Sequence, residues 1–165
     1  MKLKDILSNS WLKSELKKQH RSKEFVNIKQ ASSLGIIWQQ KDLQSIIYFK
    51  ELIGGRNICI KELCLSEEKT EYTYSRKDFS FLGKPKKQIL NHFVNEKLDI
   101  LLDFTRSSAY EVRAIVALSN AKFKVGSSGV DSSYFDLNIQ ITDKADLKYL
   151  IEQTLFYLEV INNSK

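Results

Sequence analysis

The stretch LDILLDF, residues 98–104, decides the fold class of this chain. It is nearly continuous in apolar side chains, which is typical of a strand buried on both faces of a parallel sheet. A helical pattern precedes it, with Ile89, Leu90, Phe93 and Val94 on one side, and an alanine-rich helical pattern follows it over residues 109–121. A buried strand between two helices predicts an α/β protein.

The same alternation extends outward from this strand in both directions. Helical patterns of 10–15 residues between strands predict right-handed crossovers and a mainly parallel sheet. We therefore expect a three-layer, Rossmann-like α/β fold with helices on both faces and strand order 3-2-1-4-5, with a further strand beyond. The expected strands are residues 34–38, 57–65, 71–75, 98–104, 122–126 and 134–141.

Glycine, proline and capping residues indicate where the helices begin and end. Gly54 and Gly55 are expected to end one helix in a left-handed conformation, and Pro85 is expected in the first turn of another. The last helix is the most regular, with Thr142 or Asp143 as its N-cap. Its apolar positions are Leu147, Leu150, Ile151, Thr154, Leu155, Leu158 and Ile161.

The positive charge is concentrated at the amino terminus. Residues 1–23 hold seven Lys or Arg and two acidic side chains, a net charge of +5 out of +6 for the chain. We expect residues 1–24 to form a basic helical extension of two short helices broken near SNS (8–10), attached to a single α/β domain of residues 25–165. The extension contacts an acidic partner or a membrane surface, or it lies on the domain with its lysines solvated, which we favour.

Composition excludes several classes of function. A near-neutral body argues against nucleic acid binding, which would spread basic residues over the folded surface and add stacking aromatics. No apolar run has the length of a membrane span or signal peptide, so a cytoplasmic location is expected. Cys59 and Cys64 lie five residues apart in one strand and are expected to be buried structural thiols. With only His20 and His92 besides, we expect no metal and no cofactor.

The expected strand order places a topological switch between the strands that end near Trp38 and Phe104, where open α/β sheets bind ligands. The loop DFTRSSAYE (103–111) follows the second of these, and its side chains and free helix amides suit an anion. The candidate ligand-binding residues are Asp103, Thr105, Arg106, Ser107 and Ser108, joined by Lys84, Ser127 and Ser128. The alternative, which we favour, is a capping box between Ser108 and Glu111 that needs no ligand.

No catalytic motif accompanies this loop. The first turn, IIWQQKDLQ (36–44), lacks the glycines of a dinucleotide fingerprint, and Trp38 and Gln39 would occupy the phosphate position. Neither a P-loop nor a nucleophile elbow is present. The catalytic residues are therefore unknown. Because no catalytic motif is found, we favour a protein without enzymatic activity.

Two resemblances add to this interpretation. Through FLGKPKK, NEKLDILLDFT, AIVALSNAKFKVG and LKYLIEQTLFYLEVI, the chain resembles a family of small uncharacterised bacterial proteins of unknown function. Residues 99–126 also resemble, at the level of fold, the amino-terminal half of the heptosyltransferase-type (GT-B) glycosyltransferases. The catalytic Gly-Asp of those enzymes has no equivalent at residues 39–41, and their second domain has no counterpart here.

The sequence therefore leads to two hypotheses of function. The first is a noncatalytic interaction or accessory module with a protein partner, which contacts it through the leader or through residues 67–85. The second is a domain, binding or enzymatic, for a phosphorylated or sugar-like ligand at the carboxyl ends of the strands.

Overall fold

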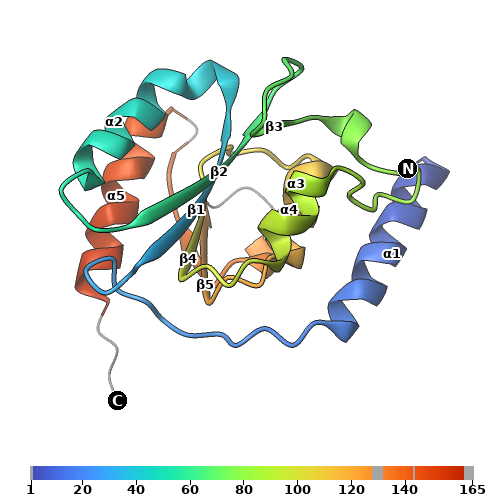
Figure 1. Cartoon of the computed structure of the whole chain (residues 1–165), viewed down its shortest axis with the longest axis horizontal. Helices are drawn as coiled ribbons and strands as arrows, with labels where there is room; N and C mark the ends of the chain where they lie inside the picture. Colours follow the sequence, from blue (N-terminus) through green and yellow to red (C-terminus); the bar gives the residue numbers. More distant parts are fainter. Residues whose placement is uncertain (1, 128–131, 143, 162–165) are drawn as a thin grey trace.

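The computed structural model describes residues 2–127, 132–142 and 144–161 and shows a six-stranded sheet between two layers of helices (Figure 1). The strand order is β3-β2-β1-β4-β5-β6, and every pair of neighbours is parallel. The predicted fold class and strand order are confirmed. The strands are β1 (Ser33–Gln39), β2 (Cys59–Leu65), β3 (Thr73–Tyr74), β4 (Ile100–Asp103), β5 (Phe123–Ser127) and β6 (Leu137–Ile139).

Helices cover both faces of this sheet. On one face lie α2 and α5, which contact each other, and on the other lie α3 and α4, with α1 against α4 (Figure 1). The helices are α1 (Leu3–Lys18), α2 (Leu43–Ile53), α3 (Gln88–Asn95), α4 (Tyr110–Leu118) and α5 (Leu147–Val160). Three short 3-10 helices complete the elements: η1 (Gln40–Asp42), η2 (Arg76–Asp78) and η3 (Ser132–Tyr134).

The central strands are buried on both faces, as the apolar run predicted. In β4, Ile100 and Leu102 pack into the core under α2 and α5, while Leu101 packs into the core under α3 and α4. All three side chains are fully buried, and each contributes about 1.5–3 kcal/mol through removal of its apolar surface from water. The alternation of side chains along β4 thus holds both helical layers to one strand.

The amino-terminal extension is one helix, α1, and the prediction of two short helices was wrong. Tertiary contacts hold the helix together through the polar SNS stretch. Ser8 is buried and its carbonyl accepts a hydrogen bond from the Tyr110 hydroxyl, and Leu12 is 1% exposed in the core under α3 and α4. Packing therefore outweighs the weak helix propensity of these residues.

Three predicted helix ends also differ from the structure. Gly54 caps α2 with φ −61°, a right-handed conformation, so no left-handed glycine ends this helix. Pro85 lies before α3 and forms a β-bridge with Phe79, while Lys87 is the N-cap. For α5, Asp146 is the N-cap, and its side chain accepts from the Tyr149 amide at 2.9 Å. Thr142 lies before it in a turn, and Asp143 lies outside the described residues.

The two cysteines have different environments. Cys64 is buried and Cys59 is exposed, and their odd spacing in β2 points them to opposite faces of the sheet. The prediction of two buried thiols was thus right for Cys64 alone. Burial raises the pKa of the Cys64 thiol to about 12, and Glu62 and Glu68 add to the effect.

Candidate functional site

The loop after β4 lies at the carboxyl ends of the strands, as predicted, and its carboxylate is turned inward. Asp103 is 3% exposed and accepts hydrogen bonds from the Thr105 amide at 2.8 Å and the Thr105 hydroxyl at 2.6 Å. Burial raises the pKa of Asp103 to about 6, and the two bonds from Thr105 oppose this rise. These contacts make Asp103 an organiser of the loop.

The same two-residue pattern of hydrogen bonds continues to the start of α4. The Ser107 amide donates to the Thr105 hydroxyl at 3.2 Å, and the Ala109 amide donates to the Ser107 hydroxyl at 3.1 Å. The predicted capping box is therefore wrong: the N-cap is Ala109, which makes no side-chain cap. Glu111 instead lies 3.7 Å from the Arg76 guanidinium. Ser107 orders the turn in place of Ser108, so the helix begins later than the box requires.

Arg106 occupies a strained position in this loop. Its φ of 53° is the only positive value among the described residues other than glycine, a conformation that costs a side-chain-bearing residue about 1–2 kcal/mol. Its guanidinium lies 3.5 Å from a carboxylate oxygen of Asp42 and donates to the Ala145 carbonyl at 3.4 Å. An anion bound by Arg106 would have to displace Asp42.

Trp38 and Gln39, at the end of β1, are both engaged within the protein. The Trp38 indole is 2% exposed, donates to Glu62 at 3.1 Å and stacks on Tyr72. The Gln39 amide donates to the Thr105 carbonyl, which ties the end of β1 to the loop after β4. Gln39 thus spans the switch point between β1 and the loop after β4, while Trp38 is turned toward β2.

The remaining predicted site residues are dispersed. Ser108 is exposed on the loop, and Ser127 is buried at the end of β5. Ser128 lies outside the described residues. Lys84 lines a different cleft, together with residues of α1, so the structure does not bring it to Asp103.

That cleft, called here the leader cleft, has a volume of about 530 Å³ and lies between α1 and α3. Leu118 and Asn120, at the end of α4, contribute to it, as do the residues that link α1 to the sheet. The lining residues are Trp11, Glu15, Lys18, Gln19, His20, Arg21, Ser22, Lys84, Pro85, Asn91, Val94, Asn95, Lys97, Leu118, Asn120 and Lys122.

The leader cleft carries an excess of positive charge. Five Lys or Arg side chains line it against one acidic side chain, Glu15. Lys18 pairs with Glu15 at 2.9 Å, and Lys122 pairs with Asp99, also at 2.9 Å. Lys84 and Lys97 have no carboxylate within ion-pair distance among the residues that the structure describes, so their charge is available to a ligand.

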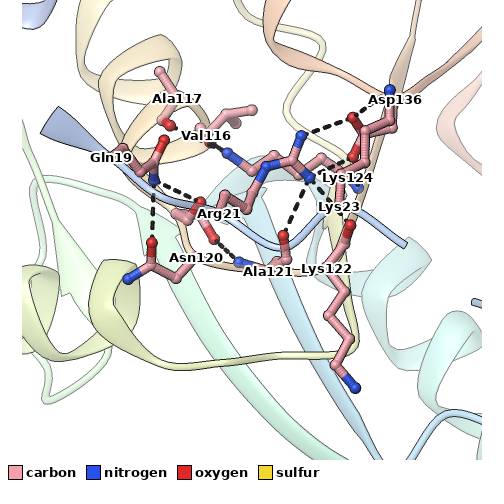
Figure 2. A network of polar contacts seen from close by, with 11 residues as sticks. Gln19, Arg21, Lys23, Val116, Ala117, Asn120, Ala121, Lys122, Lys124 and Asp136 are labelled. Carbon is pink, nitrogen blue, oxygen red and sulfur yellow. Dashed lines mark hydrogen bonds and ion pairs between the residues drawn. The ribbon is translucent and has the colours of Figure 1, made fainter. Parts of the chain in front are cut away.

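The wall formed by the linker after α1 is held by an extensive polar network, shown in Figure 2. Gln19 donates to the Leu118 and Ser119 carbonyls at 2.8 and 3.1 Å and to the Asn120 side chain at 3.2 Å. Arg21 donates to the Ala121 and Lys122 carbonyls and to both oxygens of Asp136. The linker is therefore fixed in position without a ligand.

Lys124 lies beneath this linker and closes the carboxyl end of α4. Its ammonium is buried and donates to the Val116 carbonyl at 2.6 Å and the Ala117 carbonyl at 3.1 Å (Figure 2). Burial lowers the pKa of Lys124 to about 7, Arg21 lowers it further, and Asp136 opposes the shift. The lysine thus satisfies helix carbonyls that would otherwise have no partner.

Asp99 holds Lys122, another residue that lines the leader cleft, in position. It accepts from Lys122 at 2.9 Å and from the Ser32 hydroxyl and amide. Burial alone would raise the pKa of Asp99, but the bonds from Lys122 and Ser32 outweigh it and lower the pKa to about 2. The carboxylate is ionised at neutral pH and holds the Lys122 ammonium beside the cleft.

The chemistry that this arrangement supports is the binding of an anionic group. The cationic side chains offer charge and hydrogen bonds, and the Trp11 ring offers an apolar contact. In the described part of the chain, no three His, Cys, Asp or Glu side chains are grouped to hold a metal ion. Nor does any described helix have the length and apolar composition needed to cross a membrane.

Sequence reasoning missed this cleft, because its walls come from three separate segments of the chain. Two signals pointed toward it: the basic leader and the run GKPKK (83–87). Neither specifies that α1 packs against α4, which is the contact that places α1 opposite α3 across the cleft.

Comparison with known proteins identifies the family of the chain. No curated protein and no solved structure is detectably similar to it, so the likeness to heptosyltransferase-type enzymes remains a prediction. A family model described as a family of unknown function, DUF6913, matches residues 4–161. Because that match includes α1 and all six strands, the chain as a whole belongs to the family DUF6913.

Proposed function

We propose that this protein is a noncatalytic binding module that holds an acidic segment of a partner protein in the leader cleft. The observation that carries the proposal is the presence there of two lysines, Lys84 and Lys97, that are unpaired among the described residues, whereas the other three cations of the lining each pair with a carboxylate of the chain. An acidic chain would gain charge-assisted hydrogen bonds from these ammonium groups. The proposal includes the cytoplasmic location expected from the sequence.

The arrangement of the cleft supports a binding role over a catalytic one. Arg21, Lys122 and Lys18 each pair with a carboxylate of the chain itself, so they serve to hold the walls. The lining includes Ser22 and His20 but no second carboxylate beyond Glu15 to orient a base. The groups available to a ligand are therefore the ammonium groups of Lys84 and Lys97, which bind negative charge.

A second candidate, a phosphorylated or sugar-like small ligand, is favoured by the size and lining of the same cleft. Its volume of about 530 Å³ lies within the roughly 300–1,000 Å³ range of small-molecule sites. Trp11 offers an aromatic face, and Asn91 and Asn95 offer amide oxygens that can accept from sugar hydroxyls, since their NH2 groups already donate to backbone carbonyls. The loop 103–108 is less suited to such a ligand, because the Arg106 guanidinium already pairs with the Asp42 carboxylate.

The proposal is tested with a fluorescent octaglutamate peptide and with a panel of sugar phosphates, nucleotides and inorganic phosphate. Fluorescence anisotropy measures the peptide, and thermal shift measures the small ligands. The test variant is Lys84→Glu/Lys97→Glu. Its matched control is Lys29→Glu/Lys69→Glu, which changes two exposed lysines outside the cleft and alters net charge equally.

We expect the peptide to bind, with affinity that falls as salt rises, and the test variant to weaken binding about tenfold or more. The control should weaken it less than twofold. Equal effects of both variants would reduce the binding to nonspecific attraction and overturn the proposal. A thermal shift with one small ligand, lost only in the test variant, would replace the acidic segment with the second candidate.

A further inference from the structure

The outer face of α5 carries a second apolar stripe, opposite to the one that packs on the sheet. Tyr149, Phe156 and Val160 are 46%, 57% and 52% exposed, and Gln153 completes the row. At 100° per residue these four positions fall within about 60° of one another. The buried positions Leu150, Ile151, Thr154 and Leu158 lie on the other side of the helix. Because helices of the outer layer normally present polar side chains to solvent, this stripe needs an explanation.

The charged residues beside the stripe are already engaged within the chain. Glu159 pairs with Arg56 at 2.6 Å, and Glu152 accepts from the Tyr48 hydroxyl at 2.7 Å. The Lys148 ammonium lies over the Tyr48 ring. The stripe itself contains no charged residue. A partner for this face needs an apolar surface and no complementary charge of its own.

The spacing of the stripe is symmetrical. Its positions are separated by four, three and four residues, which is the pattern of a coiled-coil seam. The pattern is the same when read from either end. An antiparallel second copy would therefore place Tyr149 opposite Val160 of the second copy, and Gln153 opposite Phe156. A two-fold axis between residues 154 and 155 makes both halves of such an interface identical.

We propose that the outer face of α5 is a homodimer interface in which two copies pack antiparallel through Tyr149, Gln153, Phe156 and Val160. The helix lies on the opposite face of the sheet from α1 and α3, the helices that line the leader cleft (Figure 1). The interface is thus independent of the binding proposed for that cleft. Fourteen residues of helix span about 21 Å. An interface of this length is at the small end of the range for specific association, so the dimer is weak.

Sedimentation velocity of the full chain between about 5 and 500 µM tests the association at concentrations where weak dimers form. We expect the sedimentation coefficient to rise with concentration in the wild type and to remain that of a monomer in Phe156→Glu. Phe81→Glu is the matched control, since Phe81 is 62% exposed in the loop before α3. A wild type that stays monomeric throughout, or a Phe81→Glu variant as impaired as Phe156→Glu, would overturn the proposal.

Charge pairs test the orientation. In an antiparallel dimer, Tyr149→Lys/Val160→Glu places opposite charges across the interface, whereas Tyr149→Lys/Val160→Lys places like charges there. We expect the first double variant to associate at least tenfold more tightly than the second. Circular dichroism confirms that both fold. Equal association of the two folded variants would contradict the antiparallel arrangement.

Discussion

The guanidinium of Arg21 binds both carboxylate oxygens of Asp136, at 2.7 and 2.8 Å, across 115 residues of sequence. Asp136 directly precedes β6, and Arg21 belongs to the linker between α1 and β1. The same carboxylate accepts the Lys124 amide at 2.9 Å. One ion pair therefore joins the basic leader to the far edge of the sheet and fixes a wall of the leader cleft.

Loss of this pair should destabilise the fold. Arg21→Ala leaves Asp136 with a side chain only 4% exposed, and breaking such a pair by removing one partner costs about 3–5 kcal/mol. Lys23→Ala is the control, because Lys23 contacts the same carboxylate at 3.3 Å but is 54% exposed; it should cost less than about 1 kcal/mol. Urea unfolding measures both. Equal losses for the two variants would contradict the structural role given to Arg21.

Lys124 should make the protein more stable as pH rises above neutrality. Its pKa is about 7 in the folded protein against 10.5 as its ordinary value, so between these values the unfolded chain binds more protons. The free energy of unfolding then increases by up to about 1.4 kcal/mol per pH unit. Urea unfolding from pH 7 to 9 should show this slope in the wild type and lose it in Lys124→Met. An unchanged slope in the variant would refute the assignment.

Local patterns made the sheet predictable from sequence, but not the cleft. The apolar run at 98–104 and the periodicity of residues 147–161 each report burial within a single element, and both were right. Helix ends were harder, because several capping groups compete within one or two residues. Ser107, not Ser108, orders the start of α4. The cleft depends on Trp11, Lys84 and Asn91 meeting in space, which no local pattern encodes.

Asp103 should make the protein less stable as pH rises, which is the opposite of the effect expected from Lys124. Its pKa is raised to about 6 by burial, from an ordinary 3.8, so the stability that its protonated form contributes is lost as pH rises from about 4 to 6. Asp103→Asn keeps an acceptor for Thr105 and cannot ionise. Relative to the wild type, the variant should gain up to about 3 kcal/mol between pH 4 and pH 7. A stability difference that does not change with pH would show that Asp103 titrates normally.

A glycine pair tests the packing at the end of β5. A Cβ at Gly126 would collide with the Phe135 ring, whereas one at Gly55 would meet no atom within 4 Å. Gly126→Ala should therefore destabilise the fold by about 1–3 kcal/mol. Gly55→Ala should be neutral or stabilising by up to about 1 kcal/mol. Thermal unfolding compares the two, and equal midpoints would contradict the close approach of Phe135.

Substitutions of Arg106 can distinguish backbone strain from ligand binding in the loop after β4. At φ 53°, alanine keeps the unfavourable backbone and glycine relieves it, while both lose the ion pair with Asp42. Arg106→Gly should therefore be more stable than Arg106→Ala by about 1 kcal/mol, measured by urea unfolding. At an ordinary negative φ the order would reverse, because glycine loses more backbone freedom on folding.

Adding inorganic phosphate to the wild type and both Arg106 variants tests whether this side chain binds an anion. Equal thermal shifts in all three would show that Arg106 does not bind phosphate, whereas a shift confined to the wild type would restore this loop as an anion site.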